Sequence, residues 1–327
     1  MSTPGDASGL AVLSGGVGGA KLVLGLYHAM APETSRERLI VVANTGDDMR
    51  YMGLHIAPDI DSVVYALADL SDKERGWGRA NETWTFMEAL KGLGGEAWFN
   101  LGDGDLAMHV ERTRRLDEGQ SLTEATGAIC GALGVRARIL PMTDDAVATI
   151  VDTPGGPLAF QHYFVRDRCE PEVTGFRFQG IADARPNPAL MRSLESGAIS
   201  SVLIAPSNPF VSVDPILGLP GMRAALKSPP GPIVAVSPIV GGQAIKGPAA
   251  KMMAELGAPV SAAGVARHYA GLVDAMVIDE VDRGQAAEIR GLGMEVLVTK
   301  TVMRSLEDRI ALARDCLAFI SDLGARA

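Results

Sequence analysis

Short apolar runs recur along the chain, and each ends at a turn that is rich in glycine or in polar residues. The runs are residues 10–13, 39–43, 202–205, 233–236, 275–279 and 295–299. Short continuous apolar runs between turn signals are typical of strands that are buried on both faces of a sheet. After the first run, Leu22, Val23, Leu26 and Met30 recur at helical spacing. This alternation predicts an α/β fold with a Rossmann-like, doubly wound and mostly parallel sheet.

The pattern changes in the middle of the chain. Beyond Gly134, shorter strand-like runs with proline-glycine turns replace the long helical segments; they are residues 136–140, 146–151, 158–165 and 174–178. We therefore predict a first part of the α/β core at residues 1–134, a smaller α+β insert at 135–190, and a second part of the core at 191–327. A further strand is expected at residues 97–101, and helices are expected from Pro58, from Pro188 and from Ser305.

Composition narrows the class of protein. The chain has 327 residues, 47% of them hydrophobic, which is enough to bury a full core. Its formal net charge is −9 and no run of Lys or Arg stands out, so we expect no nucleic-acid partner. Glycine, proline or charge interrupts every apolar run before it reaches the roughly 18 to 20 residues of a membrane span, so we expect no membrane insertion.

The cysteines and the first residues bear on location. Cys130, Cys169 and Cys316 are an odd, scattered set without C-x-x-C spacing, which favours reduced thiols over disulfides or a zinc site. Residues 1–9 show neither a basic segment nor an apolar one, so no signal peptide is predicted. We expect a cytoplasmic protein.

A glycine-rich element with a lysine follows the first predicted strand. It contains Gly16, Gly18, Gly19 and Lys21. Glycine lets backbone N–H groups approach an anion closely, and lysine adds a point charge. The element lacks the G-x-x-x-x-G-K-[ST] pattern and matches the dinucleotide fingerprint only loosely. The strand-loop-helix context favours phosphate contact, with a plain tight turn as the alternative.

A second element of the same kind follows the run at residues 233–236. Gly241 and Gly242 precede Lys246 here, far from the first element in sequence. Two glycine-lysine elements predict that one diphosphate is held from two sides.

An acidic turn lies between these two elements. Asn44, Thr45, Asp47 and Asp48 directly follow the strand at residues 39–43. In open α/β sheets ligands bind at the carboxyl ends of the strands. Adjacent carboxylates repel each other unless a cation or strong donors lie between them, and their hard oxygens suit Mg²⁺. We predict a magnesium site here, and an exposed acidic turn is the alternative.

Two other pairs of residues with acidic side chains each allow two interpretations of their role. Asp59 and Asp61 open a predicted helix, where carboxylates stabilise the helix dipole, so capping and metal binding are equally compatible with their position. Asp105 and His109 are four residues apart and would face each other on a helix. They are either a functional pair or a structural hydrogen-bonded pair, and we favour the structural role.

Two further segments offer groups for a flat ligand. Asn208 and Ser212 follow a predicted strand in a proline-fixed turn, where an amide and a hydroxyl can contact a nucleobase edge; a plain turn is as compatible. Trp77 and Trp84 present aromatic faces, although burial is the commoner position of tryptophan.

Seven segments in a fixed order extend over about residues 10 to 300. They are residues 15–21, 44–48, 58–61, 76–78, 98–107, 207–209 and 237–242. Together they resemble the 2-phospho-L-lactate transferase family of coenzyme F-420 biosynthesis. The resemblance implies transfer of a phospholactyl or phosphoenolpyruvyl group from a guanosine diphosphate conjugate to the deazaflavin Fo, with release of GMP. It also implies Mg²⁺ as cofactor, a homodimer, and an α/β core that binds the nucleotide and Fo.

The resemblance also implies roles for individual residues. Asp48 and Asp61 would hold the metal and the acceptor end of Fo, whereas Asn208, Ser212 and residues 241–246 would hold the guanosine diphosphate. Attack of an alcohol on a diphosphate requires alignment, charge neutralisation and a proton acceptor. We expect Lys21 and Lys246 to neutralise charge, and Asp48 to accept the proton in a direct displacement.

Two other classes of protein compete with this interpretation. A nucleotide-sugar-binding regulatory protein of the same superfamily would share the first glycine element and the Asn208 segment. A nicotinamide oxidoreductase would need only one glycine fingerprint, and leaves the element with Lys246 unexplained. The sequence does not distinguish lactate, enolpyruvate and glycerate as the acid of the donor.

Overall fold

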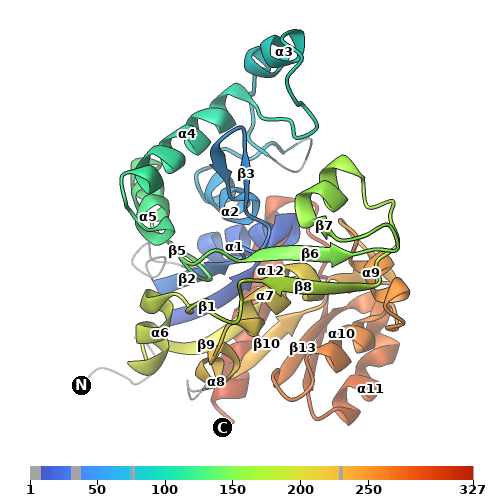
Figure 1. Ribbon diagram of the computed structural model, residues 1–327. Coiled ribbons are helices and arrows are strands. Elements are labelled where there is room, and N and C mark those ends of the chain that lie inside the picture. The colour runs from blue at the N-terminus through green and yellow to red at the C-terminus, as the bar shows by residue number, and fades with distance from the viewer. Residues whose placement is uncertain (1–8, 31–37, 74, 76–77, 228–230, 327) are drawn as a thin grey trace, which may run out of the picture.

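A central parallel sheet organises the molecule. The computed structural model describes residues 9–30, 38–73, 75, 78–227 and 231–326. In these residues a seven-stranded sheet runs in the order β5-β2-β1-β9-β10-β13-β14, and every neighbouring pair is parallel (Figure 1). The strands are β1 (Gly9–Ser14), β2 (Leu39–Ala43), β5 (Arg138–Pro141), β9 (Ile199–Ile204), β10 (Ile233–Val236), β13 (Ala275–Asp279) and β14 (Glu295–Thr299). The predicted Rossmann-like α/β fold is confirmed.

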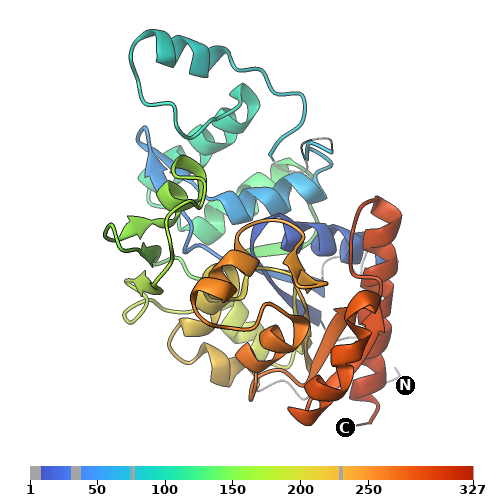
Figure 2. The same cartoon turned by 90° about the vertical axis from the view of Figure 1, so that its right-hand side faces the viewer.

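Helices cover both faces of this sheet. One face packs against α1 (Gly16–Ala29), α2 (Pro58–Leu67), α5 (Leu122–Ala132) and α12 (Leu306–Gly324). The other packs against α6 (Pro188–Glu195), α7 (Asp214–Gly218), α8 (Met222–Leu226), α9 (Ala249–Glu255), α10 (Ala262–His268) and α11 (Ala286–Gly291). Figure 2 shows α12, in red, along one side of the fold. Successive strand residues point to opposite faces: Val12 belongs to the first core and Leu13 to the second. This two-sided burial explains the continuous apolar runs.

The order of the strands creates a crevice. From β1 the chain builds β2 and β5 on one side, and it then returns to place β9 against the other side of β1. The connections after β1 and β9 therefore diverge at the carboxyl edge of the sheet. Such a switch point is where open α/β sheets bind ligands.

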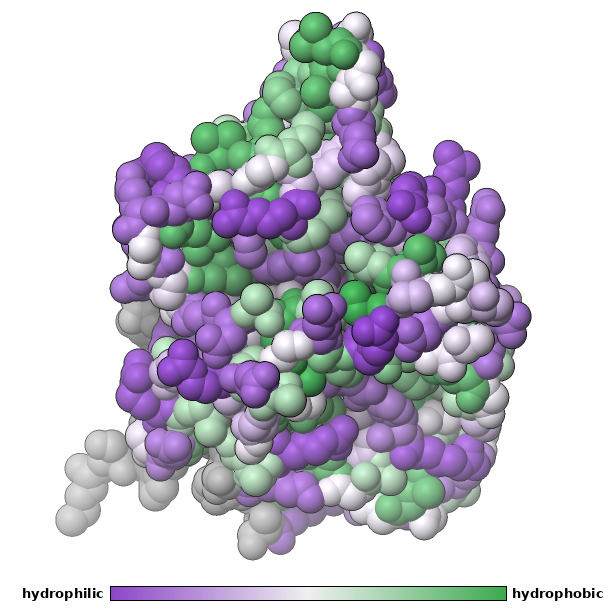
Figure 3. Space-filling view, in the orientation of Figure 1, coloured by the Kyte–Doolittle hydropathy of each residue, from purple (hydrophilic) through white to green (hydrophobic). Residues whose placement is uncertain are grey.

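An arm projects above the carboxyl edge. It consists of β3 (Met49–Tyr51), β4 (Leu54–Ile56), α3 (Thr85–Gly92) and α4 (Asp103–Asp117). Residues 97–101, all of which the structure describes, form no strand, so that prediction is wrong. Their side chains Trp98, Phe99 and Leu101 instead join Tyr51 in a small apolar cluster. Figure 3 shows the arm as a projection, and Phe86 and Leu93 are exposed on it.

A small antiparallel sheet lies beside the crevice. It contains β6 (Ala148–Asp152), β7 (Leu158–Ala159) and β8 (Gly175–Gln179). Residues 158–165 are only partly a strand, since β7 ends at Ala159 and a π-helical turn follows at His162–Arg166. The strand β5, expected within the 135–190 insert, is the edge strand of the main sheet, because its residues Ile139 and Leu140 are buried against the two helical layers.

Several remaining expectations also have outcomes. The helices expected from Pro58, Pro188 and Ser305 are confirmed as α2, α6 and α12. Cys130, Cys169 and Cys316 are free thiols. In the described part of the chain, no helix has the length and apolar character needed to cross a membrane. Trp77 lies outside the described residues.

Candidate functional site

The first glycine loop is shaped by a close approach to the loop after β9. Gly16 has a φ of +64°, which favours glycine. A Cβ added at Gly18 would lie 2.4 Å from the carbonyl oxygen of Pro206. The Ser207 hydroxyl accepts a hydrogen bond from Gly15 N at 3.0 Å and donates one to Gly15 O at 2.8 Å. The glycines at residues 15–18 therefore let two loops from opposite sides of the switch point touch.

The acidic loop after β2 is tied into the same place. Asn44 donates from Nδ2 to Asp59 Oδ2 at 3.0 Å and to Val211 O at 3.2 Å, and its Oδ1 accepts from Gly46 N at 2.8 Å. Asp59 Oδ1 in turn accepts from Gly16 N at 2.6 Å. Asn44 and Asp59 thus join the two loops to the start of α2. The predicted phosphate-binding N–H of Gly16 is engaged by Asp59 in this structure.

Burial sets the protonation of the acidic residues. It raises the pKa of Asp48 to about 6, although a hydrogen bond from His55 partly offsets this effect. Burial likewise raises the pKa of Asp59 to about 6 and, with the Asp59 charge, raises the pKa of Asp47 well above its usual range. The Asp48 Oδ2 atom lies 3.1 Å from His55 Nε2. Concentrated buried carboxyl groups with raised pKa values are characteristic of functional sites.

Several oxygens of this loop are left without partners. Asp47 Oδ1, Asp48 Oδ1 and Thr45 Oγ1 are buried and accept or donate no hydrogen bond within the described residues. Hard, unsatisfied oxygens of this kind fit Mg²⁺. No group of three or more His, Cys, Asp or Glu side chains is arranged to hold a metal in the described ranges. Mg²⁺ commonly takes one or two carboxylates together with substrate phosphates, so these residues remain compatible with it.

Asp61 has a different environment. Both of its carboxylate oxygens accept hydrogen bonds from Arg112, which is 1% exposed. Arg112 also lies 3.3 Å from His109 Nδ1, and His109 Nε2 lies 3.2 Å from Asp105 Oδ1. The Asp105–His109 pair therefore supports the guanidinium that pairs with Asp61, which agrees with the structural role we favour. A metal role for Asp61 stays a prediction. It requires one Asp61 oxygen to lose its hydrogen bond from Arg112.

The loop after β9 reaches the same crevice. Ser212 is buried, and its Cβ would lie 2.5 Å from a Cβ added at Gly15. Asn208 accepts at Oδ1 from Phe210 N at 3.0 Å, and its Nδ2 lies 3.2 Å from Met252 Sδ. Asn208 thus caps the turn that follows it, and its contact with a nucleobase stays a prediction.

The second glycine element is a hairpin. Gly241 and Gly242 have φ values of +58° and +76° between β11 (Ile239–Val240) and β12 (Gln243–Ala244). Gly241 N donates to Asp282 Oδ2 at 3.0 Å, so this N–H also has a protein partner. Lys246 is exposed just after the hairpin.

The two predicted lysines are neighbours. Burial, followed by the charges of Lys246 and Arg309, lowers the pKa of Lys21. Lys21 Nζ also donates to Met303 O at 3.4 Å. Both glycine elements therefore contribute cations to one region, as expected for an anion held from two sides.

Sequence reasoning missed several residues of this site. His55 contacts the predicted residue Asp48. Ser207 belongs to the segment 207–209 of the resemblance but was given no role, and it contacts Gly15 beside the predicted Gly16. Arg112 is 51 residues from Asp61, and no local pattern connects them.

Fold and site together define a class: a Rossmann-like α/β protein in which a glycine loop and buried carboxyl groups meet at the switch point. Residues 10–297 match the family described as 2-phospho-L-lactate transferase CofD. The chain belongs to the CofD family of 2-phospho-L-lactate transferases and is therefore an enzyme of the transferase class.

Similar proteins support this assignment. The chain is 38% identical to a phosphoenolpyruvate transferase of Streptomyces griseus over 322 residues, which is 97% of this chain and 99% of that protein. It is 40% identical to a 2-phospho-L-lactate transferase of Methanosarcina mazei over 303 residues, or 92% and 97% of the two chains. A UPF0052 family structure from Bacillus halodurans has a TM-score of 0.61 at 14% identity, covers 95% of this chain and 99% of its own, and shows the fold alone.

Proposed function

We propose that this transferase moves a phospholactyl or phosphoenolpyruvyl group from a guanosine diphosphate conjugate to the deazaflavin Fo, with release of GMP, in coenzyme F-420 biosynthesis. The observation that carries the proposal is the meeting of the acidic loop and the first glycine loop at the β1–β9 switch point, tied together by Asp59. Both kinds of relative, phosphoenolpyruvate transferases and 2-phospho-L-lactate transferases, match almost the whole chain.

In the proposed reaction, a ribityl hydroxyl oxygen of Fo bonds to the phosphorus that carries the three-carbon acid. The bond from that phosphorus to the bridging oxygen of the diphosphate breaks, and GMP leaves with the electron pair. Asp48 accepts the hydroxyl proton, and its ionised form is accessible near neutral pH because its pKa is about 6. No covalent enzyme intermediate is needed.

The chain's own groups supply the charge balance. Lys21 and Lys246 neutralise the phosphate oxygens, whose charge increases on the leaving side as GMP departs. Asn208 and Ser212 lie on the loop proposed to hold the guanosine. Asp48 would hold Mg²⁺, and Asp61 would join it if one of its oxygens lost the hydrogen bond from Arg112. The metal would further neutralise the charge of the diphosphate.

The test is incubation of the purified protein with Fo, Mg²⁺ and each of the lactyl, enolpyruvyl and glyceryl guanosine diphosphates. Mass spectrometry should detect GMP and one phosphorylated deazaflavin product in equal amounts. Product with one donor alone identifies the acid. Binding of guanosine diphosphate without transfer from any donor would support a regulatory binding protein instead.

Two parts of the proposal concern the protein's surroundings. We expect a homodimer, which light scattering on the eluting peak of a sizing column tests directly. We also expect the enzyme to work in the cytoplasm, where its free thiols remain reduced.

A further inference from the structure

One short turn of the small sheet touches three different parts of the molecule. Gln161 Nε2 donates to the backbone oxygen of Asp47 at 3.2 Å, and Gln161 is 6% exposed. The His162 ring lies 4.8 Å from the Trp98 ring of the arm. Tyr163 is fully buried, with Lys251 of α9 3.4 Å from its hydroxyl. Three successive residues therefore join the acidic loop, the arm and α9.

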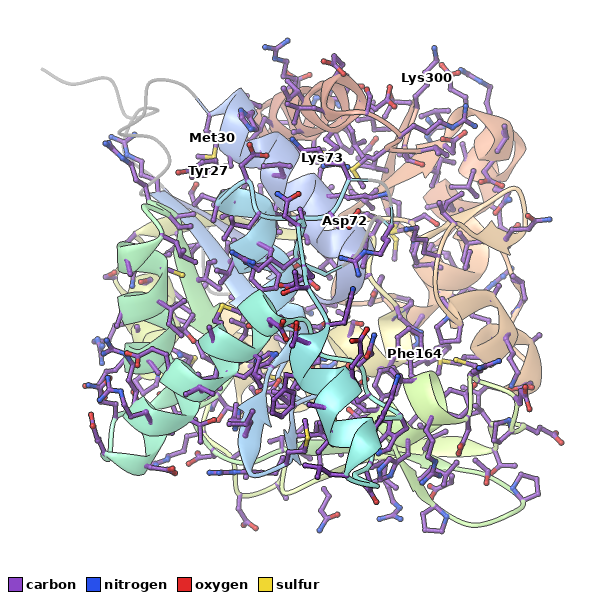
Figure 4. The ribbon with its side chains drawn as sticks, turned by 90° about the horizontal axis from the view of Figure 1, so that it is seen from above. Tyr27, Met30, Asp72, Lys73, Phe164 and Lys300 are labelled. Atoms are coloured by element: carbon purple, nitrogen blue, oxygen red, sulfur yellow. The ribbon has the colours of Figure 1, made fainter. Side chains whose placement is uncertain are left out.

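The turn itself is π-helical at His162–Arg166. Such turns are rare and frequently occur at functional sites. Figure 4, seen from above, shows Phe164 of this turn well separated from Tyr27 and Met30 at the end of α1. Phe164 is 39% exposed and stacks on Phe160, so the outer side of the turn is at the surface while Gln161 points inward.

The small sheet makes a second hydrogen bond to the acidic loop. Thr149 N donates to Gly46 O at 2.7 Å. A Cβ added at Gly46 would lie 2.6 Å from Thr149 Oγ1, so glycine is needed for this approach. The Thr149 hydroxyl is buried and finds no hydrogen-bond partner in the part of the chain that the structure describes. The carbonyl oxygens of Gly46 and Asp47 are thus both held from outside the main sheet.

The small sheet is itself fixed to the second half of the core. Lys251 donates to Pro171 O at 2.7 Å, and Glu255 accepts from Val173 N at 3.0 Å. Its hydrophobic core includes Val211 and Met252, which come from the loop after β9 and from α9. The small sheet is therefore a rigid support for the backbone of the acidic loop.

We propose that Gln161 and Thr149 are positioning residues that hold Asp47 and Asp48 in the geometry required for transfer. The proposal rests on the function proposed above. Buried carboxyl groups are costly to remove from water, so the loop would move toward solvent unless its backbone is held. Two hydrogen bonds from a rigid support oppose that movement, and small displacements of a reacting group lower rates strongly.

The test compares Gln161→Leu with Gln179→Leu, a matched variant at the exposed end of β8. Hydrogen–deuterium exchange of metal-free protein should show at least tenfold faster exchange in the peptide that contains residues 44–48 for Gln161→Leu alone. The kcat for transfer should fall about tenfold, while the KM for the donor changes less than twofold.

A second variant separates the donated hydrogen bond from packing. Gln161→Glu keeps the shape but removes the donor to Asp47 O, so it should reproduce the fast exchange and the low kcat. Wild-type exchange at residues 44–48 in Gln161→Glu would overturn the proposal.

Exchange in the α12 peptide is the reference for global stability. If α12 accelerates as much as residues 44–48, Gln161 is a general structural residue and the proposal fails. The exchange comparison needs no substrate, so it remains decisive even if the wild-type protein transfers nothing and the proposed function is wrong.

Discussion

The two sides of the crevice are built in different ways. On the acidic side, Asn44, Asp59 and Asp61 are almost fully buried. Asn44 donates a hydrogen bond to Asp59, and Asp61 accepts hydrogen bonds from Arg112. On the lysine side, Gly242 of the small hairpin and Lys246 just after it are exposed. Apart from the unpartnered oxygens of Thr45, Asp47 and Asp48, the acidic side is thus held by protein hydrogen bonds, whereas Gly242 and Lys246 are open to solvent.

The difference follows from the charges involved. Buried carboxyl groups are costly, so the fold must surround them with donors in advance. An exposed lysine carries no such cost, and Lys246 is exposed, so it needs no comparable set of buried partners. Changes on the acidic side should therefore affect stability and chemistry, and changes on the lysine side should affect ligand affinity alone.

The largest expected effect is on stability. Arg112→Met leaves Asp61 buried without its partner and should lower the free energy of unfolding by about 3–5 kcal/mol, measured by urea denaturation. Arg114→Met removes an exposed arginine from the same helix and should leave the free energy of unfolding close to that of wild type. Equal effects of the two substitutions would contradict a prebuilt acidic side.

The next effect is on catalysis. Asp48→Asn removes the proposed proton acceptor and should lower kcat at least about 100-fold. Binding of guanosine diphosphate, measured by calorimetry, should remain within twofold of wild type, because the lysine side is untouched. Asp117→Asn, at the exposed end of α4, is the control. Near-normal turnover of Asp48→Asn would remove this residue from the mechanism.

The pH dependence of stability distinguishes the two sides further. Burial raises the pKa of Asp48 and Asp59 from 3.8 to about 6 in the folded protein. Their contribution is therefore fully present below pH 3.8 and is lost as the pH rises through about 6. The free energy of unfolding, measured by urea denaturation in EDTA, should fall by on the order of 2 kcal/mol per carboxyl group between pH 4 and 7.

Asp48→Asn provides the comparison for this pH effect. It lacks one of the two groups, so its stability should fall less than that of wild type over the same range. An identical fall in both proteins would show that Asp48 is not destabilised by burial.

The smallest effect belongs to the lysine side. Lys246→Met should weaken binding of guanosine diphosphate about tenfold and leave the urea midpoint unchanged, because the side chain is exposed. Lys91→Met, on the exposed arm helix α3, should change neither quantity. If Lys246→Met lowered the stability of the protein but left its affinity for guanosine diphosphate unchanged, Lys246 would be a structural residue and not a ligand-binding one.

The sequence was sufficient for those parts of the molecule in which local pattern and burial agree. Strands such as β2 and β13 are buried on both faces, so their apolar runs are unambiguous. Residues 97–101 are also mostly apolar, but Trp98 and Phe99 pack on Tyr51 in the arm, and among the described residues no strand pairs with them. A short apolar run does not identify what it packs against.

The candidate site was predictable in its loops but not in its connections. Glycines and acids at strand ends mark the loops, because the carboxyl edge of a parallel sheet collects them. Gly16 N donates a hydrogen bond to Asp59 and Gly241 N donates one to Asp282, so two N–H groups that glycine content alone suggests are free are already engaged. Such partners come from other elements 43 and 41 residues away, which local spacing cannot show.

The contact between Gly15 and Ser207 joins positions 192 residues apart, and it has a consequence for synthesis. While the ribosome is still making the middle of the chain, β1 has only β2 as a neighbour, and its other edge waits for β9. An unpaired, apolar strand edge is a template for association with other chains. Late closure of so long a loop also slows folding, so this edge of β1 stays open until the second half of the chain has emerged.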